Sequence, residues 1–269
     1  MTALSQRALG LGTENAFVVL AEVNKLLREG RDIISFCIGQ PDFPTPPAIQ
    51  QAGIDAIQQG KHGYTPSAGI PELRQAAAAY LSRTRGIKVQ ADDVVVGAGA
   101  KPFIGYTIQS VTDFGAGDEV IYPVPGFPIY ESQIKANGAV GVPIYLREDR
   151  DFSFDPQELA AKITPRTKLL ILNSPQNPTG GILTRADLQA IADILRQHPQ
   201  VWVFADEIYG QLVYEGEFQS IAALPGMQER TVLSDGCSKT WAMTGWRLGF
   251  TANKKLAPYF TNWITNTES

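Results

Sequence analysis

The sequence contains little cysteine and little histidine. Its two cysteines, Cys37 and Cys237, cannot form a framework of several disulfides, and neither has histidine or further cysteine nearby at zinc-ligand spacing. These shortages exclude a disulfide-stapled secreted fold and disfavour a structural zinc site. We therefore predict no bound metal.

The chain also has neither a strong excess of one charge nor a long apolar run. Its 23 Lys and Arg against 27 Asp and Glu give a net charge of −4, which argues against a generally basic nucleic-acid binder. Apolar stretches such as Leu169–Leu172 are far too short to cross a membrane, and no apolar run typical of a secretory signal follows Met1–Arg7. We expect a cytoplasmic protein that binds neither nucleic acid nor membrane.

The sequence is otherwise typical of a packed α/β protein, with 269 residues of which 44% are hydrophobic and 19% charged. Leu169–Leu172 and Val201–Ala205 are apolar throughout, which is typical of strands covered on both faces of a mainly parallel sheet. We predict a doubly wound sheet with helices on both faces. The expected strands are Ile33–Ile38, Val94–Val96, Glu119–Tyr122, Val140–Tyr145, Lys168–Leu172, Val201–Ala205, Thr231–Leu233 and Arg247–Thr251.

Apolar residues at three-to-four spacing predict helices before Gly30, after Pro71 and after Thr184, which is a good N-cap. Because regular sheet begins only near residue 90, we assign residues 1–45 to an N-terminal arm and a partial small domain. Residues 46–269 are assigned to a large domain. The last predicted helix, 253–267, has an apolar face with no partner in the sequence pattern, and we expect the chain to be incomplete.

Ligands of open α/β sheets bind at the carboxyl ends of the strands, so the residues that follow each strand are candidates. In Gly97-Ala-Gly-Ala-Lys101, four small residues come just before a helix, where backbone N–H groups are open to an anion. A tight turn without a ligand would have the same composition. The loop Asn173–Gly181 has two X-Pro bonds and two glycines that would hold the Asn177 amide rigidly, and we favour a functional loop over a structural turn.

Two charged side chains complete the candidates. Asp206 follows an apolar strand, where it loses hydration and needs a cationic or N–H partner, although an Asp that caps the next element is the alternative. Lysines are normally solvated, but Lys239 lies among small residues and two tryptophans, where its neutral, nucleophilic form is favoured. Arg247 could bind a phosphate through two of its guanidinium nitrogens. With Phe127 as a stacking face, these groups suit pyridoxal 5′-phosphate.

At these positions the sequence resembles the class I/II aminotransferases, the fold-type I enzymes that use pyridoxal phosphate and are related to aspartate aminotransferase. The resemblance covers nearly the whole chain. Its most specific segments are Asn173-Ser-Pro-Gln-Asn-Pro-Thr-Gly180, Asp206-Glu-Ile-Tyr209, Ser238-Lys-Thr-Trp-Ala-Met-Thr-Gly-Trp-Arg247 and Tyr64-Thr-Pro-Ser-Ala-Gly-Ile-Pro-Glu-Leu-Arg74. It implies transfer of an amino group between an α-amino acid and a 2-oxo acid, and a homodimer.

The resemblance also implies a role for each matching residue. Lys239 would bind the cofactor covalently and move the proton, and Asp206 would pair with the pyridine nitrogen. Tyr209 and Asn177 would bond the ring phenolate oxygen, and Phe127 would stack on the ring. The phosphate would be bound by the backbone N–H groups of Ala100 and Lys101 and by the side chains of Ser238 and Arg247.

Further roles concern the substrate and the second subunit. Tyr64 would reach the phosphate of the other subunit, while Gly39, Phe127 and Asn177 would lie beside the substrate. Gly126-Phe127 stands where many aspartate-using members have Tyr-Trp. Family members continue past residue 269 with the Arg that grips the substrate carboxylate, so the resemblance implies a fragment whose C-terminal small domain is absent.

Three alternative functions remain open from the sequence. One is another pyridoxal phosphate reaction on the same fold, such as β-elimination or lyase chemistry. A second is a non-catalytic cofactor-binding or interaction module, although regulators on this fold carry a helix-turn-helix domain for which the segment before Ile33 is too short. A third is a nicotinamide-dependent oxidoreductase, which would need a fuller glycine fingerprint.

Overall fold

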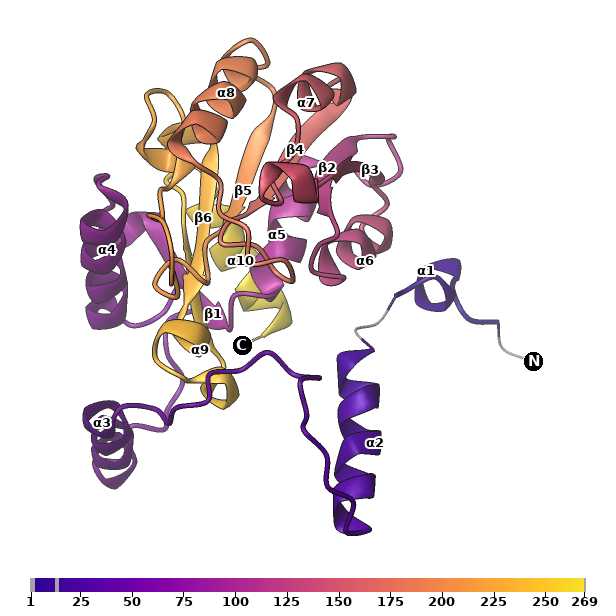
Figure 1. The fold of residues 1–269 in the computed structure, drawn as a ribbon. Coiled ribbons are helices and arrows are strands. Elements are labelled where there is room, and N and C mark those ends of the chain that lie inside the picture. Colours follow the sequence, from indigo (N-terminus) through magenta and orange to yellow (C-terminus); the bar gives the residue numbers. More distant parts are fainter. Residues whose placement is uncertain (1–2, 13–14, 269) are drawn as a thin grey trace.

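The computed structural model describes residues 3–12 and 15–268 and contains one seven-stranded sheet (Figure 1). The strand order is β1-β7-β6-β5-β4-β2-β3; β7 is antiparallel to both neighbours, and the other pairings are parallel. The strands are β1 (Val94–Ala98), β2 (Glu119–Val124), β3 (Val140–Tyr145), β4 (Thr167–Asn173), β5 (Trp202–Asp206), β6 (Thr231–Gly236) and β7 (Leu248–Ala252). The mainly parallel sheet is therefore confirmed.

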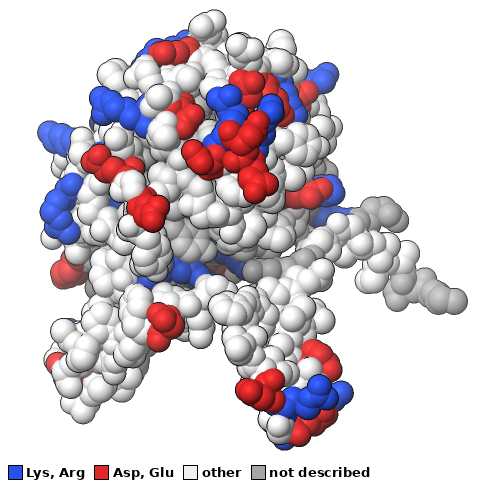
Figure 2. All heavy atoms as spheres, viewed as in Figure 1, with Lys and Arg blue, Asp and Glu red and all other residues white. Residues whose placement is uncertain are grey.

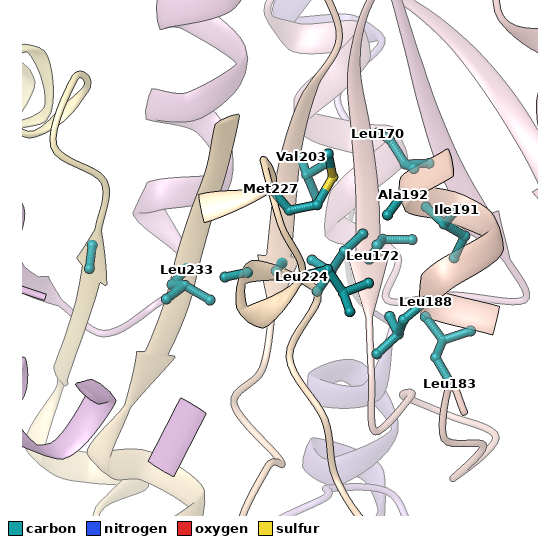
Figure 3. Close-up of a cluster of buried hydrophobic side chains, with 14 of the residues drawn as sticks. Leu170, Leu172, Leu183, Leu188, Ile191, Ala192, Val203, Leu224, Met227 and Leu233 are labelled. Carbon is teal, nitrogen blue, oxygen red and sulfur yellow. The ribbon is translucent and has the colours of Figure 1, made fainter. Parts of the chain in front are cut away.

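Helices cover both faces of this sheet. Successive residues of β4 explain why it is apolar throughout: Leu170 and Leu172 pack with α8, as Figure 3 shows, whereas Leu169 and Ile171 belong to the cluster under α5 and α10. One face carries α4 (Pro71–Arg85), α7 (Pro156–Lys162) and α8 (Arg185–Arg196), and the other carries α5 (Pro102–Val111), α6 (Ile129–Ala136) and α10 (Ala257–Thr267). The predicted doubly wound α/β class is thus confirmed.

The remaining helices are short or lie outside these two layers. They are α1 (Gln6–Leu9), α2 (Ala16–Arg28), α3 (Pro47–Gln58) and α9 (Cys237–Thr240). Single 3₁₀ turns occur at Ala91–Asp93, Glu148–Arg150, Ile221–Ala223, Gln228–Arg230 and Thr244–Trp246. No helix in the described part of the chain is both long and apolar enough to span a membrane.

Local signals determine the helix ends, and the predicted N-cap Thr184 is confirmed. The Thr184 side chain accepts a hydrogen bond from the Asp187 N–H at 3.1 Å, and Asp187 Oδ2 accepts one from the Thr184 N–H at 2.9 Å. This reciprocal capping box begins α8. At the other end of a helix, Gly86 adopts a φ of 65° and terminates α4.

The predicted strand Ile33–Ile38 is wrong. These residues form no strand, and the side chains of Ile34 and Phe36 are 82% and 92% exposed. The segment lies between α2 and α3, away from the sheet (Figure 1). Its β-branched composition favours an extended chain, but a strand also needs a hydrogen-bonding neighbour, which composition alone cannot supply.

The expectation of an uncovered face on the last helix is also wrong. Phe260 and Ile264 are buried, and the Phe260 ring lies 6.0 Å from that of Phe103 in α5. Trp263 stacks on Tyr106 of α5 with ring centroids 6.2 Å apart. The partner surface thus comes from a helix much earlier in the chain, and the doubly wound sheet brings the two helices to the same face.

Exposed apolar side chains are found instead near the N-terminus. In Figure 1, α2 and α3 project from the body that contains the sheet. Phe17, Val18 and Val19 of α2 are about half exposed or more, and Ile57 of α3 is 78% exposed. In Figure 2, both signs of charge are intermixed over the visible face of the body, and Lys and Arg also line the hollow beside the projecting helices.

Candidate active site

The candidate residues meet at one edge of the sheet. Strand register pairs Asn173 of β4 with Asp206 of β5, and Asp206 with Ser234 of β6. Because β7 runs in the opposite direction, its first residues lie at this same edge, next to the residue that follows β1. Segments far apart in the sequence therefore surround one site, as the strand-end rule predicts.

Asp206 occupies the centre of this edge and is buried, at 8% exposure. Its Oδ2 accepts a hydrogen bond from the Tyr130 hydroxyl at 2.7 Å. Its Oδ1 is also buried and has no hydrogen-bond partner among the described residues. A buried carboxylate oxygen is costly to leave unsatisfied, so this atom has the position expected for an acceptor of a ligand N–H.

Burial raises the pKa of Asp206 from its ordinary value of 3.8 to about 6. The Tyr130 hydroxyl, the Ile208 N–H and the positive charge of Lys239 act in the opposite direction and lower the pKa. The buried carboxylate is therefore incompletely compensated by protein groups. A cationic ligand that donated to Oδ1 would favour the charged form.

This shift predicts a pH-dependent stability for the cofactor-free protein. A carboxyl with a raised folded-state pKa stabilises the fold below pH 4, and the contribution is lost as the pH rises through about 6. We expect Asp206 to remove roughly 2 kcal/mol of unfolding free energy between pH 4 and pH 7.5. Urea unfolding of wild type and Asp206→Asn at both pH values isolates this group, and an equal pH dependence in both proteins would contradict the prediction.

Asn177 and Tyr209 come together as predicted. The Asn177 Nδ2 donates to the Tyr209 hydroxyl at 3.4 Å. Asn173 holds this pair in place, since its Oδ1 accepts from the Asn177 N–H at 2.8 Å and its Nδ2 donates to the Asp206 carbonyl at 3.0 Å. The sequence reasoning missed the role of Asn173, although a polar residue at the end of an apolar strand is a usable signal.

Tyr130 was also missed, and no local pattern reveals it. It lies in the first turn of α6, is 1% exposed, and its ring meets that of Phe127 edge-to-face at 5.7 Å. Burial and the neighbouring carboxylate of Asp206 raise its pKa well above 10. Tyr130 is thus a neutral donor that orients Asp206, and only the packing of α6 on the sheet shows this.

Lys239 lies in α9, half-buried, on the same side of the sheet. Its Nζ donates to the carbonyl of Gly39 and lies 5.6 Å from the centre of the Tyr209 ring. Gly39, Tyr209 and Lys239 line one cavity of about 340 Å³, together with residues of the segment 40–43. The predicted nucleophile, ring-oxygen ligand and substrate-side glycine therefore share a solvent-accessible space.

The predicted phosphate ligands surround the turn after β1. Arg247 donates from Nη2 to the Ala98 carbonyl at 3.2 Å and from Nη1 to the Thr244 carbonyl at 2.9 Å. A Cβ at Gly99, whose φ is +90°, would lie 2.3 Å from Arg247 Nη2, so only glycine leaves room for the guanidinium. Gly249 lets β7 approach equally closely, since its Cβ would lie 2.3 Å from the Ala100 nitrogen.

Three further candidates are placed less centrally. The Lys101 Nζ lies 5.3 Å from the Phe127 ring centre, so the predicted stacking residue borders the turn that precedes α5. Ser238 is the neighbour of Lys239 in α9 and is half-buried. Tyr64 is not brought into the cluster, because its side chain is 100% exposed in this single chain.

These residues fit pyridoxal 5′-phosphate on structural grounds. The orphaned Oδ1 of Asp206 suits the pyridine N–H, and the amine of Lys239 suits the aldehyde. The guanidinium of Arg247, which Gly99 allows to lie against the turn after β1, suits a phosphate. Within residues 3–12 and 15–268, no group of three His, Cys, Asp or Glu side chains could hold a metal ion.

Comparison with known proteins agrees with this arrangement. The family model for aminotransferase class I and II matches residues 31–266. The chain is 38% identical over 254 residues to an aspartate/prephenate aminotransferase from Cereibacter sphaeroides, covering 94% of this chain and 63% of the relative. It is also 38% identical over 256 residues to an aspartate aminotransferase from Geobacillus stearothermophilus, covering 94% of this chain and 64% of the relative.

Solved structures show the same likeness. The chain is similar to aspartate aminotransferase from Thermus thermophilus with maleate, with a TM-score of 0.94 and 35% identity over 99% of this chain and 69% of that one. It also resembles an aromatic aminotransferase from Pyrococcus horikoshii, with a TM-score of 0.84 and 35% identity over 91% of this chain and 66% of that one. The chain spans less than two thirds of the length of the curated relatives it matches. It belongs to the class I and II aminotransferase family.

Proposed function

We propose that this chain carries the cofactor site of an enzyme that transfers an amino group between an α-amino acid and a 2-oxo acid. The observation that supports this most directly is the buried Asp206 carboxylate with its orphaned Oδ1. It ends the strand next to the one that leads into Lys239, and the Lys239 charge acts on it. A pyridine nitrogen and an aldehyde of one ligand would match these two groups.

Members of the family use pyridoxal 5′-phosphate, which supplies an aldehyde and an electron-withdrawing ring that stabilises negative charge at the substrate Cα. Asp206 would hold the ring nitrogen and keep it protonated. Lys239 would hold the aldehyde carbon through its amine and, once the substrate amine has displaced it, would move the proton at the substrate Cα. Asn177 and Tyr209, already joined at 3.4 Å, orient the ring through its phenolate oxygen.

The remaining assignments complete this proposal. Phe127 stacks on the ring and, with Gly39 and Asn177, borders the substrate. The phosphate would be held by groups from the turn after β1, from α9 and from the residue directly before β7, namely Ala100, Lys101, Ser238 and Arg247. The fully exposed Tyr64 reaches the phosphate of a second copy in a homodimer. Residues 1–45 form the arm and part of a small domain, residues 46–269 form the large domain, and the protein acts in the cytoplasm.

The reaction class is tested by half-reactions. The protein, with any natural sequence that follows residue 269, is loaded with cofactor and mixed with a panel of amino acids that includes aspartate. We expect a donor to convert the visible absorption band to the amine form of the cofactor, and a 2-oxo acid to restore it. Ammonia and pyruvate without such reversal would instead support lyase chemistry, and the absence of any spectral change would contradict both.

A further inference from the structure

A buried cluster of charges lies beside the site and has no part in the function proposed above. Arg85, the last residue of α4, donates from Nε to Glu207 Oε2 at 2.9 Å and from Nη2 to Asp235 Oδ2 at 2.5 Å. All three side chains are at most 5% exposed. Removing charges from water costs several kcal/mol for each ion, so a buried cluster needs good geometry to persist. We call these three residues the Arg85 cluster.

Both carboxylates belong to the segments that carry the reacting groups. Glu207 directly follows Asp206 at the end of β5, and Asp235 lies near the end of β6, four residues before Lys239. The two segments also meet through the Glu207 N–H, which donates to the Ser234 carbonyl at 2.9 Å. Arg85 thus joins the end of one strand to the end of its neighbour from outside the sheet.

Further hydrogen bonds leave the two carboxylates little freedom. Glu207 Oε1 accepts from the Ser220 hydroxyl at 2.6 Å, and Asp235 Oδ1 accepts from the Gly236 N–H at 2.7 Å. Arg85 itself donates from Nη1 to Thr84 Oγ1 at 2.7 Å. Every carboxylate oxygen of the cluster therefore has a specific donor, which makes the separation of the two segments well defined.

Aromatic rings hold the guanidinium and extend the connection to α9. The centres of the Tyr80 and Phe218 rings lie 5.5 and 5.0 Å from the Arg85 Cζ. Tyr80 also packs on Trp241, two residues beyond Lys239, with ring centroids 5.2 Å apart. Arg85 and Tyr80 therefore support α9 through contacts on both sides of Lys239.

We propose that Arg85 is a positioning residue that holds the Asp206 carboxylate and the Lys239 amine at a defined separation. This inference rests on the proposed function, because that function requires both groups to act on one ligand. Arg85 touches neither reacting group and acts through Glu207 and Asp235. A misplacement of about 1 Å at a reacting group can cost on the order of 100-fold in rate, so a loosened connection should lower turnover without removing the cofactor.

The first test replaces the planar guanidinium of Arg85, which can donate to two carboxylates, by a single amine. Arg85→Lys keeps the charge but cannot reach both carboxylates in the same geometry. We expect a loss in kcat per bound cofactor of roughly 10- to 100-fold, with KM for the amino donor changed by less than about threefold. Arg83→Lys, two residues earlier and exposed, is the matched control and should behave like wild type.

A second pair of variants separates geometry from charge, and it applies also if Arg85→Lys does not fold. Glu207→Gln and Asp235→Asn each remove one negative charge. The amide introduced by Glu207→Gln can still accept from Arg85 and donate to Ser220, whereas both oxygens of Asp235 accept from N–H donors and an amide can satisfy only one. We expect Asp235→Asn to lower kcat about tenfold or more and Glu207→Gln to stay within about threefold of wild type.

Specific outcomes would overturn the inference. If Arg85→Lys and Asp235→Asn lower the unfolding temperature but keep the wild-type kcat per bound cofactor, the cluster only stabilises the fold. Equal effects of Glu207→Gln and Asp235→Asn would show that charge, not position, matters. If wild type binds cofactor but catalyses no transamination, the proposed function fails. In that case the inference is tested by the rate at which Lys239 bonds to the cofactor, measured by trapping the bond with borohydride. Arg85→Lys should lower this rate.

Discussion

Replacing Lys239 by alanine should reduce amino-group transfer by at least about 10³-fold, which is the largest effect we expect of any single substitution. The side chain is half-buried in the cavity that it shares with Tyr209 and Gly39, and it supplies the amine at this edge of the sheet. Lys239→Arg keeps the positive charge but has no nucleophilic amine, so it should be equally inactive. Turnover is measured with the amino donors and 2-oxo acid that support the half-reactions of wild type.

The same variants test how the cofactor is attached. Borohydride should fix pyridoxal phosphate to the wild-type peptide that contains Lys239, and mass spectrometry should find no such adduct in Lys239→Ala. Lys254→Ala, which removes an exposed lysine that lies just beyond the end of β7 and does not line the cavity, is the control and should keep both turnover and adduct. A reduced adduct on another lysine, or an active Lys239→Ala protein, would refute the assignment.

Replacing Asp206 by alanine should lower kcat on the order of 10²–10³-fold while most of the cofactor remains bound. In the proposed function, the charge of this carboxylate would keep the ring nitrogen protonated, whereas cofactor retention would depend mainly on Lys239 and the phosphate ligands. Asp206→Asn keeps the shape and the contact with Tyr130 but loses the charge, so it should be nearly as impaired. Stopped-flow measurement of the half-reaction separates proton transfer from cofactor loss.

Tyr130→Phe provides a graded comparison for Asp206. It removes only the hydroxyl that donates to Oδ2 at 2.7 Å, and a hydrogen bond to a charged group contributes about 1.5–3 kcal/mol. We expect a loss in kcat of roughly 10-fold, smaller than that of Asp206→Ala. Unchanged turnover in Asp206→Ala would remove this carboxylate from the mechanism, whatever the effect of Tyr130→Phe.

Much of the site could be predicted because the ends of the strands can be recognised in the sequence. The apolar runs that become β4 and β5 are followed directly by Asn173 and Asp206, and parallel strands bring such positions to one edge. Lys239 could be distinguished from the other lysines because it lies among small residues and two tryptophans. The family resemblance then supplied roles, such as those of Tyr209 and Asn177, that no spacing rule would have assigned.

The residues that were missed act across the fold. Tyr130 reaches Asp206 from a helix 76 positions earlier, and Arg85 reaches Glu207 and Asp235 over 122 and 150 positions. In most sequences, a tyrosine near the start of one helix and an arginine in the last turn of another would be expected at the protein surface. Their roles depend on burial and on specific partners distant in the chain, and the periodicity of the sequence predicts neither the burial nor the partners.

The sequence by itself determined the α/β class, the strands that form the sheet, the N-cap of α8 and the candidates for the reactive side chains, because these depend on local periodicity, capping and strand order. Only the tertiary structure decided that Ile34 and Phe36 stay outside the sheet, that α10 packs on α5, and that one oxygen of Asp206 is left for a ligand. The physical reason is that a strand needs a neighbour, an apolar face needs a partner and a buried charge needs a donor. Each of these is provided by a segment distant in the chain, and its position is set by packing.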